Sequence, residues 1–190
     1  MFCRNSKKLR KILLIILIAV IIFANFKIIL RSFFPLEYKE SILQYSELYN
    51  VDPIWVASVI NTESKFNAEA VSSKGAMGLM QIMPDTGIWI AELIGIENFT
   101  EEMIKDPNVN INLGTWYLNK LSDDFNGDYD LVLAAYNGGP GNVSRWLVNE
   151  EYSDDGVKLR VIPFDETKNY VKRVKLNYTM YKFLYDFNIK

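Results

Sequence analysis

The sequence predicts an all-α domain behind an N-terminal transmembrane helix, and three observations lead to this fold class. Two Asp-Pro pairs, Asp52-Pro53 and Asp106-Pro107, each place an acid that can cap a helix before a proline at the first helical position. The alternation of apolar and polar residues that is typical of strands is nearly absent. An almost continuous apolar run at residues 12–30 lies near the start of the 190-residue chain.

The first predicted element is the membrane helix. Residues 1–11 carry five basic side chains and no acid, and the 19 residues of the run 12–30 are interrupted only by Asn25 and Lys27. This is about the length that crosses a hydrocarbon core, with the lysine side chain reaching back to the interface. We therefore expect a basic cytoplasmic tail at 1–11, a signal anchor at 12–30 and a linker at 31–36.

Two further features of the sequence bear on whether this segment is cleaved and on its orientation in the membrane. A cleaved signal peptide is the competing interpretation, but small residues at the spacing of a cleavage site are missing after the run, where "NFKIILRSFF" is bulky and apolar. Five basic residues precede the run and only Lys27 and Arg31 follow, which places the N-terminus in the cytoplasm. We therefore expect a single-pass protein of the cell membrane whose domain lies on the extracytoplasmic side.

The elements of the domain, at residues 37–190, follow from helical spacing and from start and stop signals. About 155 residues suit one domain, with no room for a second. A short turn is expected near residues 100–105. Residues 71–84 are too rich in glycine for a helix and too numerous for a simple turn. The expected helices span residues 37–49, 53–64, 85–95, 107–124, 129–136, 141–150 and 165–186.

Charge and composition exclude several classes of function. All 23 acidic residues lie beyond residue 31, whereas 7 of the 21 basic residues lie within the first 31, so the remaining chain carries a net charge of −9. Such a domain is not expected to bind nucleic acid. The sequence has no histidine, which excludes His-based triads and His-ligated zinc, and its only cysteine, Cys3, falls in the predicted tail. We expect neither a metal nor a cofactor.

Glu63 lies on the predicted apolar face of the helix at 53–64. The inward positions Val56, Val59 and Ile60 continue at helical spacing to residue 63. A glutamate in the last turn of a helix is ordinarily a solvated surface group, but partial burial and the negative end of the helix dipole would both raise its pKa. A carboxyl that is neutral near pH 7 can donate a proton, so Glu63 is the candidate general acid.

Four short motifs follow one another along the domain: "ES" at residues 63–64, "SKGAMGLMQ" at 73–81, "AYNGG" at 135–139, and "ET" followed by "YV" within 166–171. In this order they resemble the motifs of the lytic transglycosylase catalytic domain, of the soluble transglycosylase type in glycoside hydrolase family 23. The likeness covers roughly residues 40–186, and no motif position departs from the pattern. It implies a lysozyme-like α fold and peptidoglycan glycan strands as the binding partner.

The resemblance implies a glycan cleft whose wall is the segment 71–84. Met80 and Gln81 would line the subsite beside the acid, where the amide offers a donor and an acceptor to sugar hydroxyls and acetamides. Met77 and Met83 would pack underneath, a role that methionine also fills in any irregular core. The substrate-binding residues implied by the first two motifs are Ser64, Ser73, Met80 and Gln81.

The last two motifs add Tyr136, Asn137, Glu166 and Tyr170 to the implied substrate-binding residues. Tyr136 would lie near the acid and Asn137 would face an N-acetyl group, although a plain core role stays open for the tyrosine ring. Glu166 and Tyr170 are one helical turn apart on one face. The resemblance brings Tyr170 to the Glu63 carboxyl and Glu166 to a supporting position, for which a role at the helix N-terminus is the alternative. The four tryptophans could stack on sugars, but scattered tryptophans in a helical domain more often belong to the core, where we expect them.

The resemblance also implies a reaction, the cleavage of the β-1,4 bond between N-acetylmuramic acid and N-acetylglucosamine with formation of 1,6-anhydro ends. Glu63 would serve both proton steps, while the acetamide and the C6 hydroxyl of the substrate replace a second carboxylate and water. Two alternatives stay open. A hydrolytic muramidase would need a placed water, and Glu166 is the only other acid within the matched motifs. A peptidoglycan-binding module of an envelope assembly would keep the fold without turnover.

Overall fold

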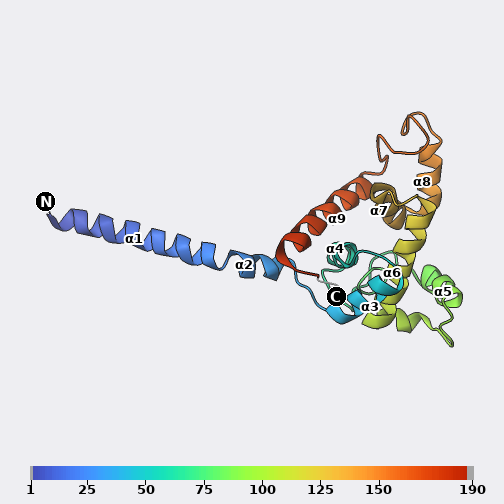
Figure 1. Ribbon diagram of the computed structural model, residues 1–190, viewed down its shortest axis with the longest axis horizontal. Helices are drawn as coiled ribbons and strands as arrows, with labels where there is room; N and C mark the ends of the chain where they lie inside the picture. Colours follow the sequence, from blue (N-terminus) through green and yellow to red (C-terminus); the bar gives the residue numbers. More distant parts are fainter. Residues whose placement is uncertain (1, 188–190) are drawn as a thin grey trace. The chain divides into compact units, whose positions relative to one another are not determined.

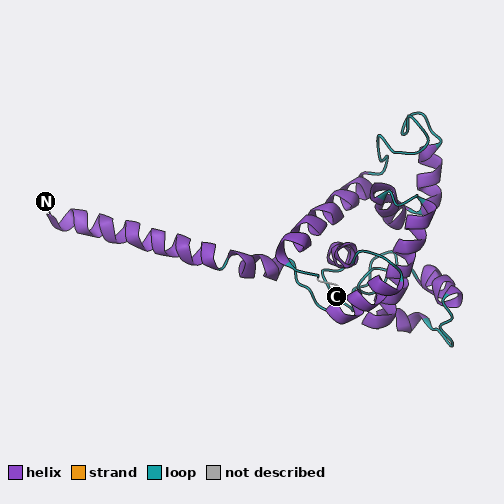
Figure 2. Cartoon of the chain, viewed as in Figure 1, coloured by secondary structure: helices purple, strands orange, loops and turns teal. Residues whose placement is uncertain are grey.

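The computed structural model describes residues 2–187, except the side chains of residues 2–7 and 9; residue 1 of the predicted tail and residues 188–190 of the predicted domain lie outside that description. Figure 1 and Figure 2 show helices joined by loops, and the described residues form no strand. The predicted all-α class is therefore confirmed. The chain divides into two compact units, Met1–Phe34 and Pro35–Lys190.

The N-terminal unit consists of α1 (Phe2–Ala24) and α2 (Phe26–Phe33). They are separated at Asn25, whose Nδ2 donates to a backbone carbonyl of α1 at 2.8 Å. In the described part of the chain, no single helix is long and apolar enough to cross a membrane; Arg10–Ala24 and Phe26–Phe33 pass that test only as a pair bent by 58°. The unbroken helix predicted at 12–30 is therefore not confirmed. At the bend, Ile21 O accepts from both the backbone N and the side-chain Nδ2 of Asn25, at 3.0 and 2.8 Å, so a polar side chain shares a carbonyl of the helical backbone.

Each helix predicted for the domain is present, and its ends differ from the prediction by no more than three residues. The caps are those predicted: Asp52 Oδ1 accepts from Ile54 N at 2.8 Å, and Asp106 Oδ1 accepts from Asn108 N and Val109 N at 2.9 and 3.0 Å. The elements are α3 (Lys39–Leu48), α4 (Pro53–Glu63), α5 (Pro84–Leu93), the 3₁₀ helix η1 (Glu101–Lys105), α6 (Pro107–Asp124), α7 (Tyr129–Gly138), α8 (Pro140–Leu147) and α9 (Asp165–Leu184).

The packing of α4 and α7 against α9 positions the site (Figure 1). The inward face of α4 is the predicted one, because Val56, Val59 and Ile60 are fully buried. Gly138 at the end of α7 permits a close approach to α9, since a Cβ at this position would lie 3.0 Å from Thr167 Oγ1. The end of α4, the end of α7 and the start of α9 therefore meet in one region of the domain.

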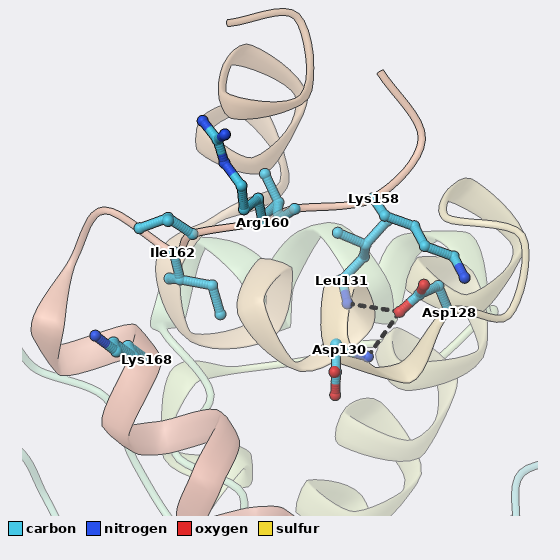
Figure 3. Close-up of a pocket in the computed structure, with 9 residues that line it drawn as sticks. Asp128, Asp130, Leu131, Lys158, Arg160, Ile162 and Lys168 are labelled. Atoms are coloured by element: carbon cyan, nitrogen blue, oxygen red, sulfur yellow. Dashed lines mark hydrogen bonds between the residues drawn. The ribbon is translucent and has the colours of Figure 1, made fainter. Parts of the chain in front are cut away.

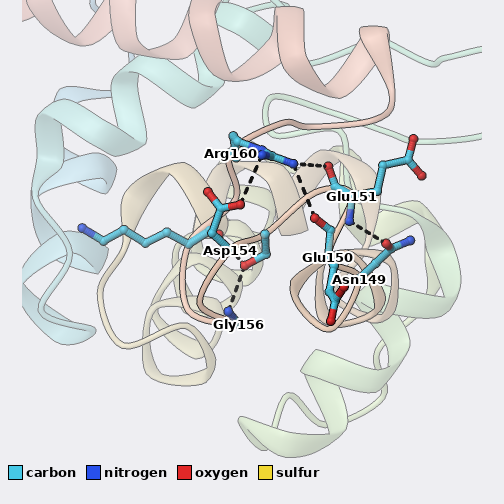
Figure 4. Close-up of polar contacts among 8 residues, drawn as sticks. Asn149, Glu150, Glu151, Asp154, Gly156 and Arg160 are labelled. Carbon is cyan, nitrogen blue, oxygen red and sulfur yellow. Dashed lines mark hydrogen bonds and ion pairs between the residues drawn. The ribbon is translucent and has the colours of Figure 1, made fainter.

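The long connection between α8 and α9, residues 148–164, is held together from within. Arg160 Nη1 pairs with Asp154 Oδ1 at 3.2 Å, and Arg160 Nη2 donates to the backbone carbonyls of Glu150 and Glu151 at 3.4 and 3.0 Å (Figure 4). One guanidinium thus gathers both ends of the connection. The path that returns the chain to the start of α9 is therefore defined although it contains no helix.

Candidate active site

Glu63 is the last residue of α4, and its side chain is only partly exposed. Burial is the largest cause that raises the pKa of Glu63 from the ordinary 4.5 to about 7. The Tyr170 hydroxyl and the Arg173 charge act in the opposite direction, and the Glu166 charge raises the pKa further. Burial outweighs the two opposing effects, so a large share of Glu63 carries a proton at neutral pH, as its place on the apolar face predicted.

Two phenols lie beside this carboxyl. Burial first, and then the charge of Glu63, raise the pKa of Tyr136 and of Tyr170 well above the ordinary 10. Tyr136 Oη donates to Met80 O at 2.9 Å. The buried Tyr170 hydroxyl is near enough to lower the pKa of Glu63, yet among residues 2–187 it meets no acceptor at standard hydrogen-bond geometry. The contact between Tyr170 and Glu63 is therefore loose. Both phenols are neutral and can donate hydrogen bonds.

A cleft of about 350 Å³ opens beside Glu63. One wall is the connection between α4 and α5, and the other is formed by the end of α7 and the start of α9. Its lining residues are Glu63, Ser72, Ser73, Lys74, Ala76, Gln81, Met83, Tyr136, Asn137 and Glu166. Five of the predicted substrate-binding residues are thus brought together: Ser73, Gln81, Tyr136, Asn137 and Glu166. The other three, Ser64, Met80 and Tyr170, do not line it.

Ser64 and Met80 support the cleft wall from behind. Ser64 Oγ donates to Leu79 O at 2.8 Å and so ties the end of α4 to the wall. Met80 is fully buried against Gly114, where a Cβ would lie 2.4 Å from Met80 Sδ. Met83, by contrast, is 42% exposed and lines the cleft. The prediction is therefore wrong for both residues: Met80 lies in the core and Met83 lines the cleft. Met80 can lie in the core because Gly114 has no side chain and leaves space for it.

Gln81 presents one defined group to the cleft. Its Nε2 donates to Ala70 O at 3.1 Å and to Gly78 O at 3.0 Å. Both amide hydrogens are used in these bonds, so Oε1 is the group that remains for a ligand. The sequence predicted that this side chain offers a ligand both a donor and an acceptor, whereas the structure leaves only the acceptor Oε1 available.

Asn110 on α6 supports the site and was not singled out from the sequence. The side chain is fully buried; its Nδ2 donates to Met77 O at 3.0 Å and to Ile104 O at 2.7 Å, while Oδ1 accepts from Met80 N at 2.7 Å. These bonds fix the middle of the cleft wall. The predicted helix 107–124 contains four asparagines, so the sequence offered little reason to choose this one. The available signal was its place between a valine and an isoleucine, because a buried polar group requires hydrogen-bond partners.

An ion pair crosses the mouth of the cleft. Lys74 Nζ lies 3.6 Å from Glu166 Oε2, and both side chains are largely exposed. Exposed pairs of this kind add little stability. The main effect of the pair is electrostatic: the positive charge of Lys74 lies beside the carboxylate of Glu166, which is the second acid of the cleft.

A second hollow, of about 410 Å³, continues this cleft along α7 and reaches the start of α5. The two hollows share Gln81, Met83, Tyr136 and Asn137. Together they form an elongated depression, which we call the groove, with Glu63 in one part of it. Because the two hollows share four lining residues, the groove can hold a ligand that runs through both.

A separate hollow of about 360 Å³ shares no lining residue with the groove (Figure 3). Its acids serve the fold: Asp128 Oδ1 accepts from Asp130 N and Leu131 N at 3.0 and 3.3 Å, which caps α7 (Figure 3), and the Asp130 carboxylate pairs with Lys175 at 2.8 Å. The acids of this hollow are therefore engaged in helix capping and ion pairing, unlike Glu63.

The fold and the groove define a helical domain that can perform general acid chemistry on an extended ligand. A family model described as the transglycosylase SLT domain matches residues 40–157. The chain belongs to this family, and the family resemblance is confirmed; the match includes the first three motifs, while the fourth, at residues 166–171, lies beyond it.

Curated relatives agree with this assignment. The chain is 36% identical over 147 residues to a soluble lytic murein transglycosylase of Escherichia coli strain K12, which covers 76% of this chain and 23% of the relative. It is 40% identical over 134 residues to a transglycosylase of Enterobacteria phage PRD1, covering 70% and 43%. The chain thus spans about a quarter of the length of the Escherichia coli relative.

Solved structures show the same fold. The 70-kDa soluble lytic transglycosylase of Escherichia coli superposes with a TM-score of 0.71 at 32% identity, covering 79% of this chain and 25% of that chain. An inactive mutant of the lytic transglycosylase Slt of Pseudomonas aeruginosa gives a TM-score of 0.70 at 34% identity, covering 80% and 25%. The predicted lysozyme-like transglycosylase fold is therefore confirmed.

Proposed function

We propose that this chain is a lytic transglycosylase that cleaves the β-1,4 bond between N-acetylmuramic acid and N-acetylglucosamine in peptidoglycan. The observation that carries the proposal is one largely enclosed carboxyl, that of Glu63, which has a pKa of about 7 and lines the groove. Membership of the transglycosylase SLT domain family and the names of the matched relatives support it.

In the first step, protonated Glu63 donates its proton to the glycosidic oxygen as the bond from that oxygen to C1 of the muramoyl residue breaks. The acetamide oxygen of the same residue bonds to C1 and takes the place of a protein nucleophile. Gln81 Oε1 and Asn137 line the groove and orient the sugar through its hydroxyl and amide groups. Tyr170 then donates to the carboxylate left on Glu63.

In the second step, the C6 hydroxyl oxygen of the muramoyl residue bonds to C1, and its proton returns to Glu63. The acetamide leaves C1, the 1,6-anhydro ring closes, and the carboxyl is restored without consuming water. An intramolecular hydroxyl can reach an effective molarity of about 10⁵ M or more when well oriented, which allows it to outrun water. One carboxyl with a pKa near neutrality suits both proton transfers.

A hydrolytic route needs a positioned water, which a second carboxylate usually holds. Glu166 is the only other acid that lines the cleft among the described residues, and it is exposed and paired with Lys74 at 3.6 Å. A supporting role for Glu166 fits this position better than a role as the catalytic base. The geometry therefore favours ring closure over hydrolysis.

We also propose that the domain acts from the outer face of the cell membrane, held there by residues 12–30. The basic residues before this run and its apolar length support the placement, and the bent pair Arg10–Ala24 and Phe26–Phe33 is long and apolar enough to cross a membrane. Protease added to intact spheroplasts should digest the domain and leave a short membrane fragment. A mature N-terminus between about residues 30 and 36 would contradict an uncleaved anchor.

The activity is tested by digestion of purified sacculi with the full chain and its Glu63→Gln variant. The variant should lose at least about a hundredfold in rate, because general acid catalysis contributes about 10²- to 10⁴-fold. Glu69→Gln is the matched control: Glu69 is exposed, lies in the same connection and does not line the cleft, so the variant should cleave at the rate of the parent. A Glu63 variant within about tenfold of the parent would contradict the proposal.

A further inference from the structure

One flank of α5 continues the groove as an exposed apolar strip. Met83 precedes α5 and lines both hollows, and Thr86 lines the second hollow. Trp89 and Leu93 follow on the same flank of the helix, three and seven residues after Thr86. Met83 and Trp89 are each 42% exposed and Leu93 is 57% exposed. We call Met83, Thr86, Trp89 and Leu93 the α5 strip.

A chain of aromatic rings links this strip to the catalytic cleft. The Tyr136 and Tyr117 ring centroids lie 5.5 Å apart, and Trp89 lies 6.3 Å from Tyr117. Trp89 meets Tyr117 at 89° and Trp116 at 75°, with the latter centroid 5.5 Å away. These edge contacts hold the indole in place and leave a large part of it open to solvent.

The other tryptophans do not share this exposure. Trp55 is covered by stacked rings of Tyr129 and Tyr178 at 4.5 and 4.2 Å, and Trp146 is only 6% exposed. Of the four tryptophans expected in the core, Trp146 is buried, Trp55 and Trp116 are half-buried, and Trp89 is exposed, so the expectation is wrong for Trp89. A large ring that is anchored at its edges and open beside a groove is suited to bind a ligand.

The chemistry of the strip fits a sugar. A pyranose presents C–H groups that pack on an indole face, while its hydroxyls stay in water, and tryptophan combines a broad apolar surface with few rotatable bonds. The strip begins at two residues that already line the groove, so a glycan strand leaving the groove along α5 would meet Trp89 next. We propose that the α5 strip, with Trp89 at its centre, binds the strand beyond the groove and makes the protein select long glycans; this inference rests on the proposed function.

The test is a binding measurement in the Glu63→Gln background, in which turnover is suppressed. Titration calorimetry of the full chain compares a tetramer of N-acetylglucosamine with an octamer, which is twice as long and which we expect to extend past the groove to the strip. Trp89→Ala should weaken octamer binding by about five- to tenfold, the range expected for loss of one aromatic contact, and leave tetramer binding unchanged.

Three further variants separate a binding role from a structural one. Trp89→Phe keeps a ring and should restore most of the octamer affinity. Leu93→Ser alters an exposed side chain at the far end of the strip and should weaken the octamer about two- to threefold without disturbing the Trp89 contacts. Ile88→Ala is the matched control, because Ile88 is 50% exposed on the other flank of α5, and it should bind both oligomers like the parent.

The outcomes distinguish this inference from the proposed function. If the parent binds both oligomers and the Trp89 and Leu93 variants bind the octamer as tightly as the parent, the strip has no role and the inference is wrong while the groove stands. Equal weakening of both oligomers by Trp89→Ala, with no change in Leu93→Ser, would also overturn it. If the parent binds neither oligomer, the proposed glycan function fails and the inference fails with it.

Discussion

The raised pKa of Glu63 makes the stability of the domain fall as the pH rises. A group that holds its proton more tightly in the folded than in the unfolded chain contributes stability that is present in full below its unfolded pKa and is lost as the pH rises through its folded pKa. For Glu63 the ordinary value is 4.5 and the folded value is about 7. The loss therefore falls between about pH 4.5 and pH 7, because above this window the folded protein must enclose a charged carboxylate.

The magnitude follows from these two pKa values. One pKa unit corresponds to about 1.4 kcal/mol, so the change from 4.5 to about 7 corresponds to at most about 3 kcal/mol of unfolding free energy. Glu63→Gln removes the titration while nearly preserving the volume of the side chain. At about pH 8 the variant should be more stable than the parent by up to about 3 kcal/mol, and near pH 4.5 the two should be almost equal.

Thermal unfolding followed by circular dichroism measures this difference. For a domain of about 155 residues, about 3 kcal/mol corresponds to a Tm increase of about 6–12 °C for the variant at about pH 8. Glu69→Gln, which alters an exposed acid, should show no such pH-dependent gain. A Glu63→Gln variant that is less stable than the parent at about pH 8, or a Tm difference that is the same at both pH values, would refute the enclosed neutral carboxyl.

Two further predictions concern the electrostatics and the wall of the cleft. The cleavage rate should fall about tenfold per pH unit above about pH 7, where Glu63 loses its proton. Arg173→Gln should move this fall to higher pH and Glu166→Gln should move it to lower pH, because the Arg173 charge lowers the Glu63 pKa and the Glu166 charge raises it. Movement in the same direction for both variants would contradict this prediction. Gly78→Ala should lower the urea unfolding midpoint far more than Gly95→Ala: both glycines have positive φ, but only at Gly78 would a Cβ clash, 2.3 Å from an Asn110 side-chain atom, and equal losses would show that backbone strain alone is responsible.

Local sequence signals accounted for the helices and for the acid. Asp52 and Asp106 cap the helices that they were expected to start, because capping depends on residues only two or three positions away. Glu63 follows the apolar spacing of α4, so its enclosure could be predicted from one helix without knowledge of its partners.

The remaining errors arise from contacts between distant parts of the chain. Met80 is buried and Met83 is exposed because Gly114 on α6 opens a gap under Met80, which no local spacing reveals. Asn110 supports a wall segment about 30 residues earlier in the chain through side-chain bonds. Trp89 stays exposed because its partner rings lie on α6 and meet it edge-on.

Asn25 is a different case, because its signal was local and visible. The asparagine was counted as a tolerated interruption of the apolar run, whereas its side chain bonds to the backbone of α1 and the helix ends there. A polar residue that can bond to the preceding turn therefore needs to be weighed as a break even inside an apolar run.

The measurement that tests the central claim most directly is the fate of water during cleavage. Purified sacculi are digested by the full chain in water enriched in heavy oxygen, and the muropeptides are identified by mass spectrometry. The proposed mechanism predicts 1,6-anhydromuramic ends that are lighter than hydrolysis products by one water and carry no label, because the C6 hydroxyl closes the ring after Glu63 has donated its proton. Labelled reducing ends as the main product would contradict it and would make Glu166 the first residue to examine for positioning water.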